Sequence, residues 1–165
     1  MATQKITRLS EIIGEGYREF WNFKGRYLLC KGSRGSKKST TAALKIIFNM
    51  LKYPESNALV VRQTFNTLRD SCWKQLQWAT EKLGVADKWK FTVSPLEATY
   101  IPTGQKIYFR GLDNPLSITS LTVAKGYLCY CWLEEAYQIT SEDDFNKIDL
   151  SFRGELPDGY YRQFI

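Results

Sequence analysis

The chain of 165 residues contains no histidine. This absence excludes the Ser-His-Asp and Cys-His arrangements of nucleophilic catalysis and removes histidine as a general base. It also excludes the common Cys₂His₂ zinc site, and the four cysteines, at positions 30, 72, 129 and 131, form no C-x-x-C pair. Any catalysis must therefore use carboxylates, lysine, arginine and a metal ion, and the thiols indicate a reduced, intracellular environment.

Long hydrophobic runs are missing as well. The longest apolar run, Tyr127–Leu133, is strand-length, well short of the ~20 residues that cross a bilayer. The N-terminal residues lack the hydrophobic segment of a secretory signal. Apolar residues make up 44% of the chain and aromatic residues 15%, which argues against disorder. We expect a globular, cytoplasmic protein of one domain, without membrane contact, whose net charge of +6 gives weak support for a polyanionic partner.

The most informative segment is Tyr27–Thr40, in which an apolar stretch, a Gly/Ser-rich loop and a Lys-Ser pair follow one another. Such a loop turns successive backbone N–H groups toward one anion, and the following helix adds a partial positive charge. Gly32, Lys38 and Ser39 match the G-x-x-x-x-G-K-[ST] pattern, while Lys37 replaces its second glycine. Lys37 is tolerable there only if its backbone keeps a negative φ or accepts left-handed strain.

The loop predicts a nucleoside triphosphate site. Lys38 is expected to reach the β- and γ-phosphates and the Ser39 hydroxyl to bind Mg²⁺, while Arg34 and Lys37 add positive charge near the same phosphates. Arg34 is also the best candidate for neutralising charge on the transferred phosphoryl group. The alternative is a basic surface turn without a ligand. The residues expected to bind the nucleotide are Gly32, Ser33, Arg34, Gly35, Ser36, Lys37, Lys38, Ser39 and Thr40.

The rest of the chain alternates between helical and extended patterns. Apolar periodicity predicts helices over 9–21, 42–51, 64–83 and 142–150, and strands over 27–30, 57–62, 127–133 and 160–165. Short strands over 89–93, 98–101 and 106–109, with a turn at 102–105, predict an antiparallel edge or insertion. The strand-helix alternation indicates an α/β fold with a mostly parallel central sheet flanked by helices.

An acidic pair, Glu134-Glu135, directly follows the apolar strand 127–133. In P-loop enzymes an acidic residue at such a strand end holds the Mg²⁺ shell, and a following glutamate can polarise the attacking water. Glu134 takes the metal role here and Glu135 the catalytic role. The alternative is two carboxylates that leave the core into water. Because one sheet edge collects the ends of parallel strands, we expect this pair to face the phosphate loop.

Three other features allow two interpretations. The polar segment Gly111–Lys125 could approach phosphates or DNA, although a solvated loop is the commoner case. Arg62 and Arg153 could neutralise phosphoryl charge, although surface or structural ion pairs are commoner for arginine.

The ordered set of segments resembles the large terminase subunits of tailed bacteriophages. The resemblance covers about residues 25–165 and is carried by Lys31–Ser39, Tyr108–Asp113 and Trp132–Ala136. It implies an ASCE-type P-loop ATPase with ATP and Mg²⁺ as ligands, with Lys38, Arg34 and Glu135 in catalysis and Ser39 and Glu134 at the metal. It further implies double-stranded DNA, portal protein and small terminase subunit as partners, a homo-oligomeric ring during packaging, and a place in the host cytoplasm.

Under this resemblance, residues 1–165 are one ATPase domain with an N-terminal helical segment at 1–24, and the coupling motif and nuclease of the family lie outside this sequence. We therefore expect weak or no turnover from this piece alone. Two other functions stay open: a nucleotide- or DNA-binding module with little turnover, and a small-molecule P-loop kinase. The adjacent Glu134 and Glu135 after a buried strand fit water activation better than a kinase.

Overall fold

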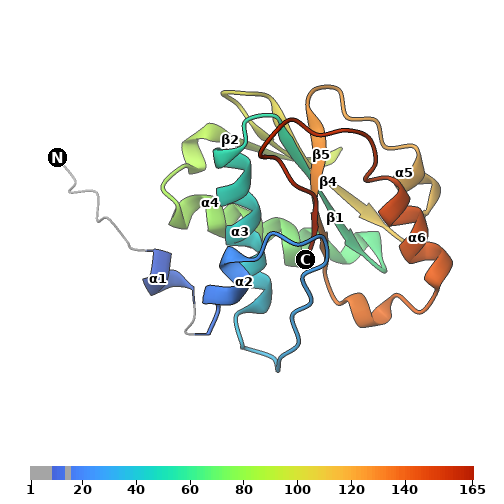
Figure 1. Cartoon of the computed structure of the whole chain (residues 1–165), viewed down its shortest axis with the longest axis horizontal. Helices are drawn as coiled ribbons and strands as arrows, with labels where there is room; N and C mark the ends of the chain where they lie inside the picture. The colour runs from blue at the N-terminus through green and yellow to red at the C-terminus, as the bar shows by residue number, and fades with distance from the viewer. Residues whose placement is uncertain (1–8, 14–15) are drawn as a thin grey trace.

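The computed structural model describes residues 9–13 and 16–165, and it is built around a six-stranded sheet of order β2-β3-β4-β1-β5-β6 (Figure 1). Neighbouring strands pair in parallel from β4 through β1 and β5 to β6, and antiparallel from β2 through β3 to β4. This pairing confirms the predicted α/β fold with a mostly parallel sheet and an antiparallel edge. The strands are β1 Ser56–Arg62, β2 Trp89–Val93, β3 Leu96–Tyr100, β4 Gln105–Gly111, β5 Tyr127–Leu133 and β6 Gln163–Phe164.

Helices cover both faces of the sheet (Figure 1). Helices α3 (Lys38–Lys52) and α4 (Lys74–Lys82) pack on one face, and α5 (Leu116–Thr119) and α6 (Glu142–Leu150) pack on the other. The central strand β1 contributes to the hydrophobic cores on both faces of the sheet. Ala58 and Val60 pack in the core under α3 and α4, and Leu59 and Val61 pack in the core under α5 and α6. All four of these side chains are fully buried, which explains why the strand is a continuous apolar run.

The predicted helix 9–21 is wrong in its continuity. Two short helices occupy this stretch, α1 (Leu9–Ile12) and α2 (Arg18–Asn22), and residues 14 and 15 between them lie outside the described part. Gly16, just before α2, has φ +89°. This left-handed conformation is open to glycine and interrupts a right-handed helix.

The predicted strand 27–30 is also wrong. Only Tyr27 forms a bridge, to Phe164, and Leu28 N–H donates to the Phe164 carbonyl at 2.8 Å. Leu29 is 91% exposed, so the apolar run borders the sheet without entering its core. Strand β6 lies between this segment and β5. The loop and the acidic pair therefore leave the same edge of the sheet, with one strand between them.

Other expected elements differ in detail. Of the predicted strand 160–165, only β6 (Gln163–Phe164) forms. In place of one helix over 64–83, a 3₁₀ turn (Phe65–Thr67) and a π-helical turn (Arg69–Trp73) precede α4. The polar connection 111–125 contains the short helix α5, which the buried side chains of Leu112 and Ile118 anchor on the sheet. Among the helices of the described residues, none has the length and apolarity that a membrane crossing requires.

Candidate nucleotide-binding site

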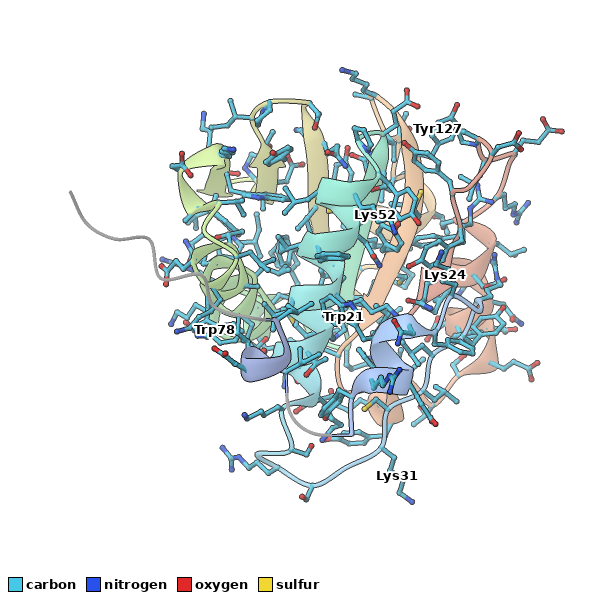
Figure 2. The ribbon with its side chains drawn as sticks, turned by 60° about the vertical axis from the view of Figure 1, so that its left-hand side comes forward. Trp21, Lys24, Lys31, Lys52, Trp78 and Tyr127 are labelled. Atoms are coloured by element: carbon cyan, nitrogen blue, oxygen red, sulfur yellow. The ribbon has the colours of Figure 1, made fainter. Side chains whose placement is uncertain are left out.

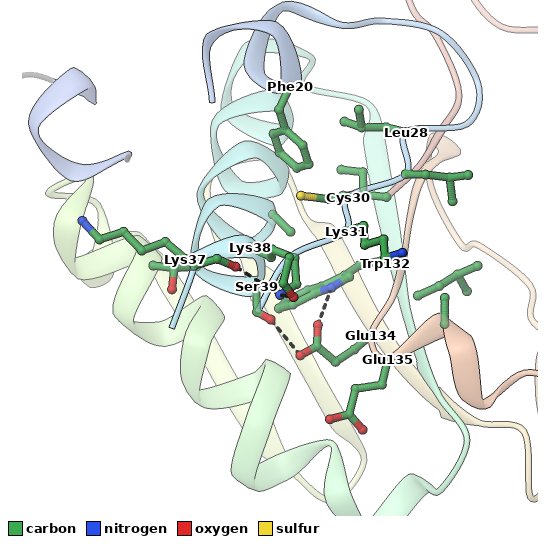
Figure 3. A pocket seen from close by; sticks show the side chains of 18 of the residues that line it. Phe20, Leu28, Cys30, Lys31, Lys37, Lys38, Ser39, Trp132, Glu134 and Glu135 are labelled. Atoms are coloured by element: carbon green, nitrogen blue, oxygen red, sulfur yellow. Dashed lines mark hydrogen bonds between the residues drawn. The ribbon is translucent and has the colours of Figure 1, made fainter. Parts of the chain in front are cut away.

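An open cavity of about 1140 Å³ lies where the phosphate-loop segment and the carboxyl end of β5 meet (Figure 3). Its walls come from the loop, from the start of α3, from residues 132–137 and from Phe20 of α2. The loop extends from one end of the molecule, and Figure 2 shows Lys31 far from Lys52 and Tyr127 at the other end. The predicted loop and acidic pair therefore share one cavity.

The loop delivers Lys38 at the first position of α3. The Lys38 ammonium nitrogen donates to the Ser33 carbonyl at 3.0 Å, to Ser36 Oγ at 3.1 Å and to the Gly32 carbonyl. Gly35 has φ +83°, a left-handed turn that glycine adopts without strain. The cation is thus held inside the concave side of the loop, where a phosphate is expected to meet it.

Lys37 takes the left-handed conformation that its position demands, with φ 64° and ψ 18°. Its carbonyl accepts hydrogen bonds from Thr41 N at 2.9 Å and Thr41 Oγ1 at 2.8 Å, which fixes the junction of loop and helix. The side chain points away from Ser39 and Glu134 (Figure 3). Lys37 therefore shapes the loop through its backbone, and its ammonium group is not directed at the acidic pair.

Ser39 and Glu134 are in direct contact. Ser39 Oγ donates to Glu134 Oε1 at 2.8 Å, and the indole nitrogen of Trp132 donates to Glu134 Oε2 at 3.0 Å. Mg²⁺ prefers oxygen ligands and is usually bound through one or two carboxylates together with substrate phosphates. A hydroxyl and a carboxylate oxygen held this close fit that ion.

Glu135 is the other left-handed non-glycine residue among those described, with φ 54° and ψ 47°. Its Oε2 forms an ion pair with the Arg62 guanidinium, and their side chains are 34% and 18% exposed. The hydrogen bond to Glu135 raises the pKa of Arg62. Backbone strain of this kind costs of order 1–3 kcal/mol and collects at functional sites. Both strained residues lie at this cavity.

Three tethers outside the loop support the cavity wall. Tyr17 OH donates to the Ser36 carbonyl at 2.6 Å, which joins the start of α2 to the loop. Lys45, 1% exposed on α3, donates to the carbonyl of Phe20 at 2.6 Å and to a second carbonyl just after α2, and burial lowers the pKa of its ammonium to about 8. Arg26, just before the loop, forms an ion pair with the carboxylate of Asp149 in α6 at 2.9 Å.

Nearly all of the predicted site residues line the cavity: Gly32, Arg34, Gly35, Ser36, Lys37, Lys38, Ser39, Thr40, Glu134 and Glu135. Ser33 does not line it and contributes its carbonyl to Lys38. Arg153 is exposed and lies outside the lining. Sequence reasoning missed Trp132, Tyr17 and the pairing of Arg62 with Glu135. The available signal was that Arg62 ends one predicted strand while Glu134 and Glu135 directly follow another.

The chain is similar in sequence to known phage proteins. Residues 24–165 match the sequence profile of the family described as phage terminase large subunit. The terminase large subunit of Bacillus phage SPP1 is 38% identical over 161 residues, covering 94% of this chain and 38% of that protein. The PBSX phage terminase large subunit of Bacillus subtilis strain 168 is 34% identical over 122 residues, covering 74% and 27%. The chain thus spans well under half the length of these relatives.

Solved structures match at the level of the fold. The large terminase of a thermophilic bacteriophage superposes with a TM-score of 0.63 at 17% identity, covering 90% of this chain and 36% of that one. The ATPase domain of the Thermus phage P74-26 large terminase gives a TM-score of 0.56 at 16% identity, covering 84% and 58%. With the sequence match over residues 24–165, these findings show that the chain has a terminase ATPase fold and belongs to the phage terminase large subunit family.

Proposed function

We propose that this chain is the ATP-hydrolysing part of a viral DNA-packaging motor that uses Mg²⁺. The observation that carries the proposal is one cavity lined by a cationic loop, by the bonded Ser39 and Glu134, and by Glu135. Under this proposal residues 1–165 belong to one ATPase domain. Another structure of the large terminase from the thermophilic bacteriophage, at 17% identity, contains ATP-γ-S, which supports ATP as the nucleotide.

The triphosphate binds in the concave side of the loop. Lys38 exchanges its contacts with the Gly32 and Ser33 carbonyls for phosphate oxygens, and the partial positive charge at the start of α3 favours the same anion. Arg34 is exposed at the cavity and is free to neutralise charge that develops on the transferred phosphoryl group. These cations supply the electrostatic part of catalysis.

Ser39 and Glu134 would hold a magnesium ion, which would supply charge neutralisation for the phosphates. Ser39 binds Oε1 of the Glu134 carboxylate and the Trp132 indole binds Oε2, so the carboxylate keeps its orientation. Glu135 takes the role of general base. Arg62 occupies its Oε2, and no hydrogen bond among the described residues uses Oε1, which is therefore available to a water molecule.

The polymer partner is double-stranded DNA. A structural neighbour at 9% identity and a TM-score of 0.51 is described as the Phi-28 gp11 DNA packaging motor. Together with the net charge of +6, this supports DNA as the substrate that is moved. The portal protein and the small terminase subunit are the further proposed partners, in a homo-oligomeric ring within the host cytoplasm.

The first test compares ATP binding by the wild type, Lys38→Ala and a matched control, Lys52→Ala, which removes an exposed lysine at the far end of the same helix. Only Lys38→Ala is expected to lose binding. The second test measures DNA-stimulated hydrolysis for Glu135→Gln against the exposed control Glu155→Gln. Because a positioned general base contributes roughly 10²–10⁴-fold, Glu135→Gln is expected to lose hydrolysis and keep ATP binding.

The outcomes separate the candidate functions. Failure of the wild type to bind ATP rejects the proposal. ATP binding without turnover in any variant favours a nucleotide-binding module, a function that Lys37 in place of the loop glycine supports. Hydrolysis that survives Glu135→Gln at the wild-type rate assigns the base to another residue.

A further inference from the structure

The exits of strands β1 and β4 are joined beyond the regular sheet. Arg62 and Gly111 are paired as the last residues of the two strands. After them, Leu112 N–H donates to the Arg62 carbonyl at 3.0 Å and Asp113 N–H donates to the Gln63 carbonyl at 3.1 Å. The chain that follows Arg62 is therefore fixed to the chain that follows Gly111.

The Asp113 carboxylate adds a side-chain contact to this junction. Phe65 N–H lies 3.2 Å from Asp113 Oδ2 and 3.3 Å from Oδ1, so it donates to the carboxylate. Phe65 begins the 3₁₀ turn Phe65–Thr67, and Thr64, the residue before that turn, makes no side-chain capping bond. Asp113, in the connection that follows the neighbouring strand β4, thus caps a turn that lacks a side-chain cap of its own.

Gly111 permits this contact through close approach. A Cβ atom at Gly111 would lie 2.5 Å from Phe65 N and still closer to Asp113 Oδ1, whereas real Cβ atoms stay beyond about 3.0 Å. The first atom belongs to the backbone and cannot turn aside. A glycine is required here by space, since its φ is not in the left-handed region.

The capped turn and the π-helical turn after it both contact the Arg62 guanidinium. Arg62 Nη1 lies 3.5 Å from the carbonyl of Thr67, the last residue of the capped turn, and donates to Ser71 Oγ in the π-helical turn at 3.3 Å. The Ser71 hydroxyl in turn donates to the Thr67 carbonyl at 2.7 Å, which joins the two turns. The other terminal nitrogen, Nη2, contacts Glu135. The contacts therefore run from Asp113 through the turn to Arg62 and on to Glu135.

We propose that Asp113 is a positioning residue for hydrolysis: by capping the turn after β1, it keeps the Arg62 guanidinium directed at Glu135. The inference rests on the proposed function of Glu135 as general base. Asp113 itself lies outside the residues that line the nucleotide cavity. Its loss is therefore expected to change kcat and leave ATP affinity within about twofold, because a small misplacement of a catalytic group affects the chemical step most.

A spectroscopic measurement tests the positioning without any turnover. The Arg62 side-chain N–H signal is assigned by its loss in Arg62→Lys, and its hydrogen exchange is followed in wild type, Asp113→Ala, Asp113→Asn and the exposed control Asp87→Ala. Exchange is expected to accelerate at least about tenfold in Asp113→Ala, as for a lost hydrogen bond to a charged group. Asp113→Asn keeps an oxygen acceptor and is expected to remain near wild type, as is Asp87→Ala.

A double-mutant cycle tests the consequence for hydrolysis. Asp113→Ala is expected to lower kcat by about 10- to 100-fold in the wild-type background. In the Arg62→Ala background it is expected to lower kcat by less than about twofold, because coupled residues are not additive. A residue that only stabilises the fold lowers kcat equally in both backgrounds, and that result overturns the proposal.

Failure of the proposed function gives a different pattern. If Glu135→Gln hydrolyses ATP at the wild-type rate, the assignment of Glu135 as general base fails and the exchange measurement alone decides the positioning. An unchanged Arg62 signal in Asp113→Ala overturns the inference. Accelerated exchange in Asp113→Ala with recovery in Asp113→Asn supports it.

Discussion

Replacing Lys37 with glycine restores the residue that the phosphate-loop pattern normally has at this place. Lys37 holds φ 64°, and its side chain is exposed and points away from Ser39 and Glu134 (Figure 3). No hydrogen bond or ion pair of its ammonium group is found among the described residues. The substitution therefore acts on backbone strain and removes no hydrogen bond or ion pair found among the described residues.

Two opposing free energies set the size of the effect. A non-glycine residue in the left-handed region costs roughly 1–2 kcal/mol, a penalty that glycine avoids. Glycine loses more backbone entropy on folding, which offsets roughly 0.5–1 kcal/mol of that gain. Lys37→Gly is therefore expected to raise the free energy of unfolding by about 0.5–1 kcal/mol, equivalent to a rise in Tm of about 2 °C for a chain of this size.

Chemical denaturation followed by circular dichroism measures this difference, and Lys37→Ala is the matched control. Alanine removes the same lysine side chain and keeps a Cβ atom in the left-handed region, so it is expected to lie within about 0.5 kcal/mol of the wild type. A glycine variant no more stable than the alanine variant would show that φ 64° carries no strain here, and the reasoning would be refuted.

Three further measurements test an exposed thiol, a buried thiol and one tether of the loop. Cys30 is the exposed cysteine of the four and lines the cavity. One thiol is therefore expected to react promptly with Ellman's reagent in the native protein, and bound ATP is expected to slow this reaction. Prompt reaction of two or more thiols would contradict the fold. Burial raises the pKa of the Cys129 thiol to about 11, so its contribution to stability is full below the ordinary thiol pKa near 9 and is lost as the pH rises toward 11. Between these values the free energy of unfolding should fall more steeply in the wild type than in Cys129→Ala, by at most about 1.4 kcal/mol per pH unit, and equal slopes would contradict the assignment. Tyr17→Phe removes the 2.6 Å hydrogen bond to the Ser36 carbonyl and is expected to lower the free energy of unfolding by about 1 kcal/mol in denaturant titrations; no loss would show that water replaces the tether fully.

The parts of the site that sequence predicted correctly are those that local chemistry determines. A Lys-Ser pair after a glycine loop begins a helix, and α3 begins at Lys38. An apolar strand followed by charge ends where the core ends, and β5 ends at Leu133, immediately before Glu134. Parallel strands collect such ends at one sheet edge, so the meeting of Ser39 with Glu134 was predictable without coordinates.

The parts that sequence missed depend on what lies beside each segment. The apolar run 27–30 has the composition of a buried strand, yet Leu29 is 91% exposed because the run lies at the border of the sheet beyond β6. The pairing of Arg62 with Glu135 depends on the order of β1 and β5 in the sheet, which periodicity does not encode. The composition of a segment indicates which secondary structure it can form, and the segments packed beside it determine which one it forms.

The two strained residues show how the protein itself fixes two sides of the cavity. Lys37 precedes the phosphate lysine and Glu135 carries the proposed general base, and each is held by bonds that the protein itself supplies. The Lys37 carbonyl accepts from Thr41, and the Glu135 carbonyl accepts from Gln138 N at 2.9 Å while Arg62 binds its carboxylate. Strain persists only where the surroundings over-determine it. The free-energy cost of orienting both groups is therefore met during folding. Under the proposed function, a bound triphosphate then needs to reorganise little more than the contacts of Lys38. Charged groups that are oriented before the reaction are the ones that stabilise a transition state most.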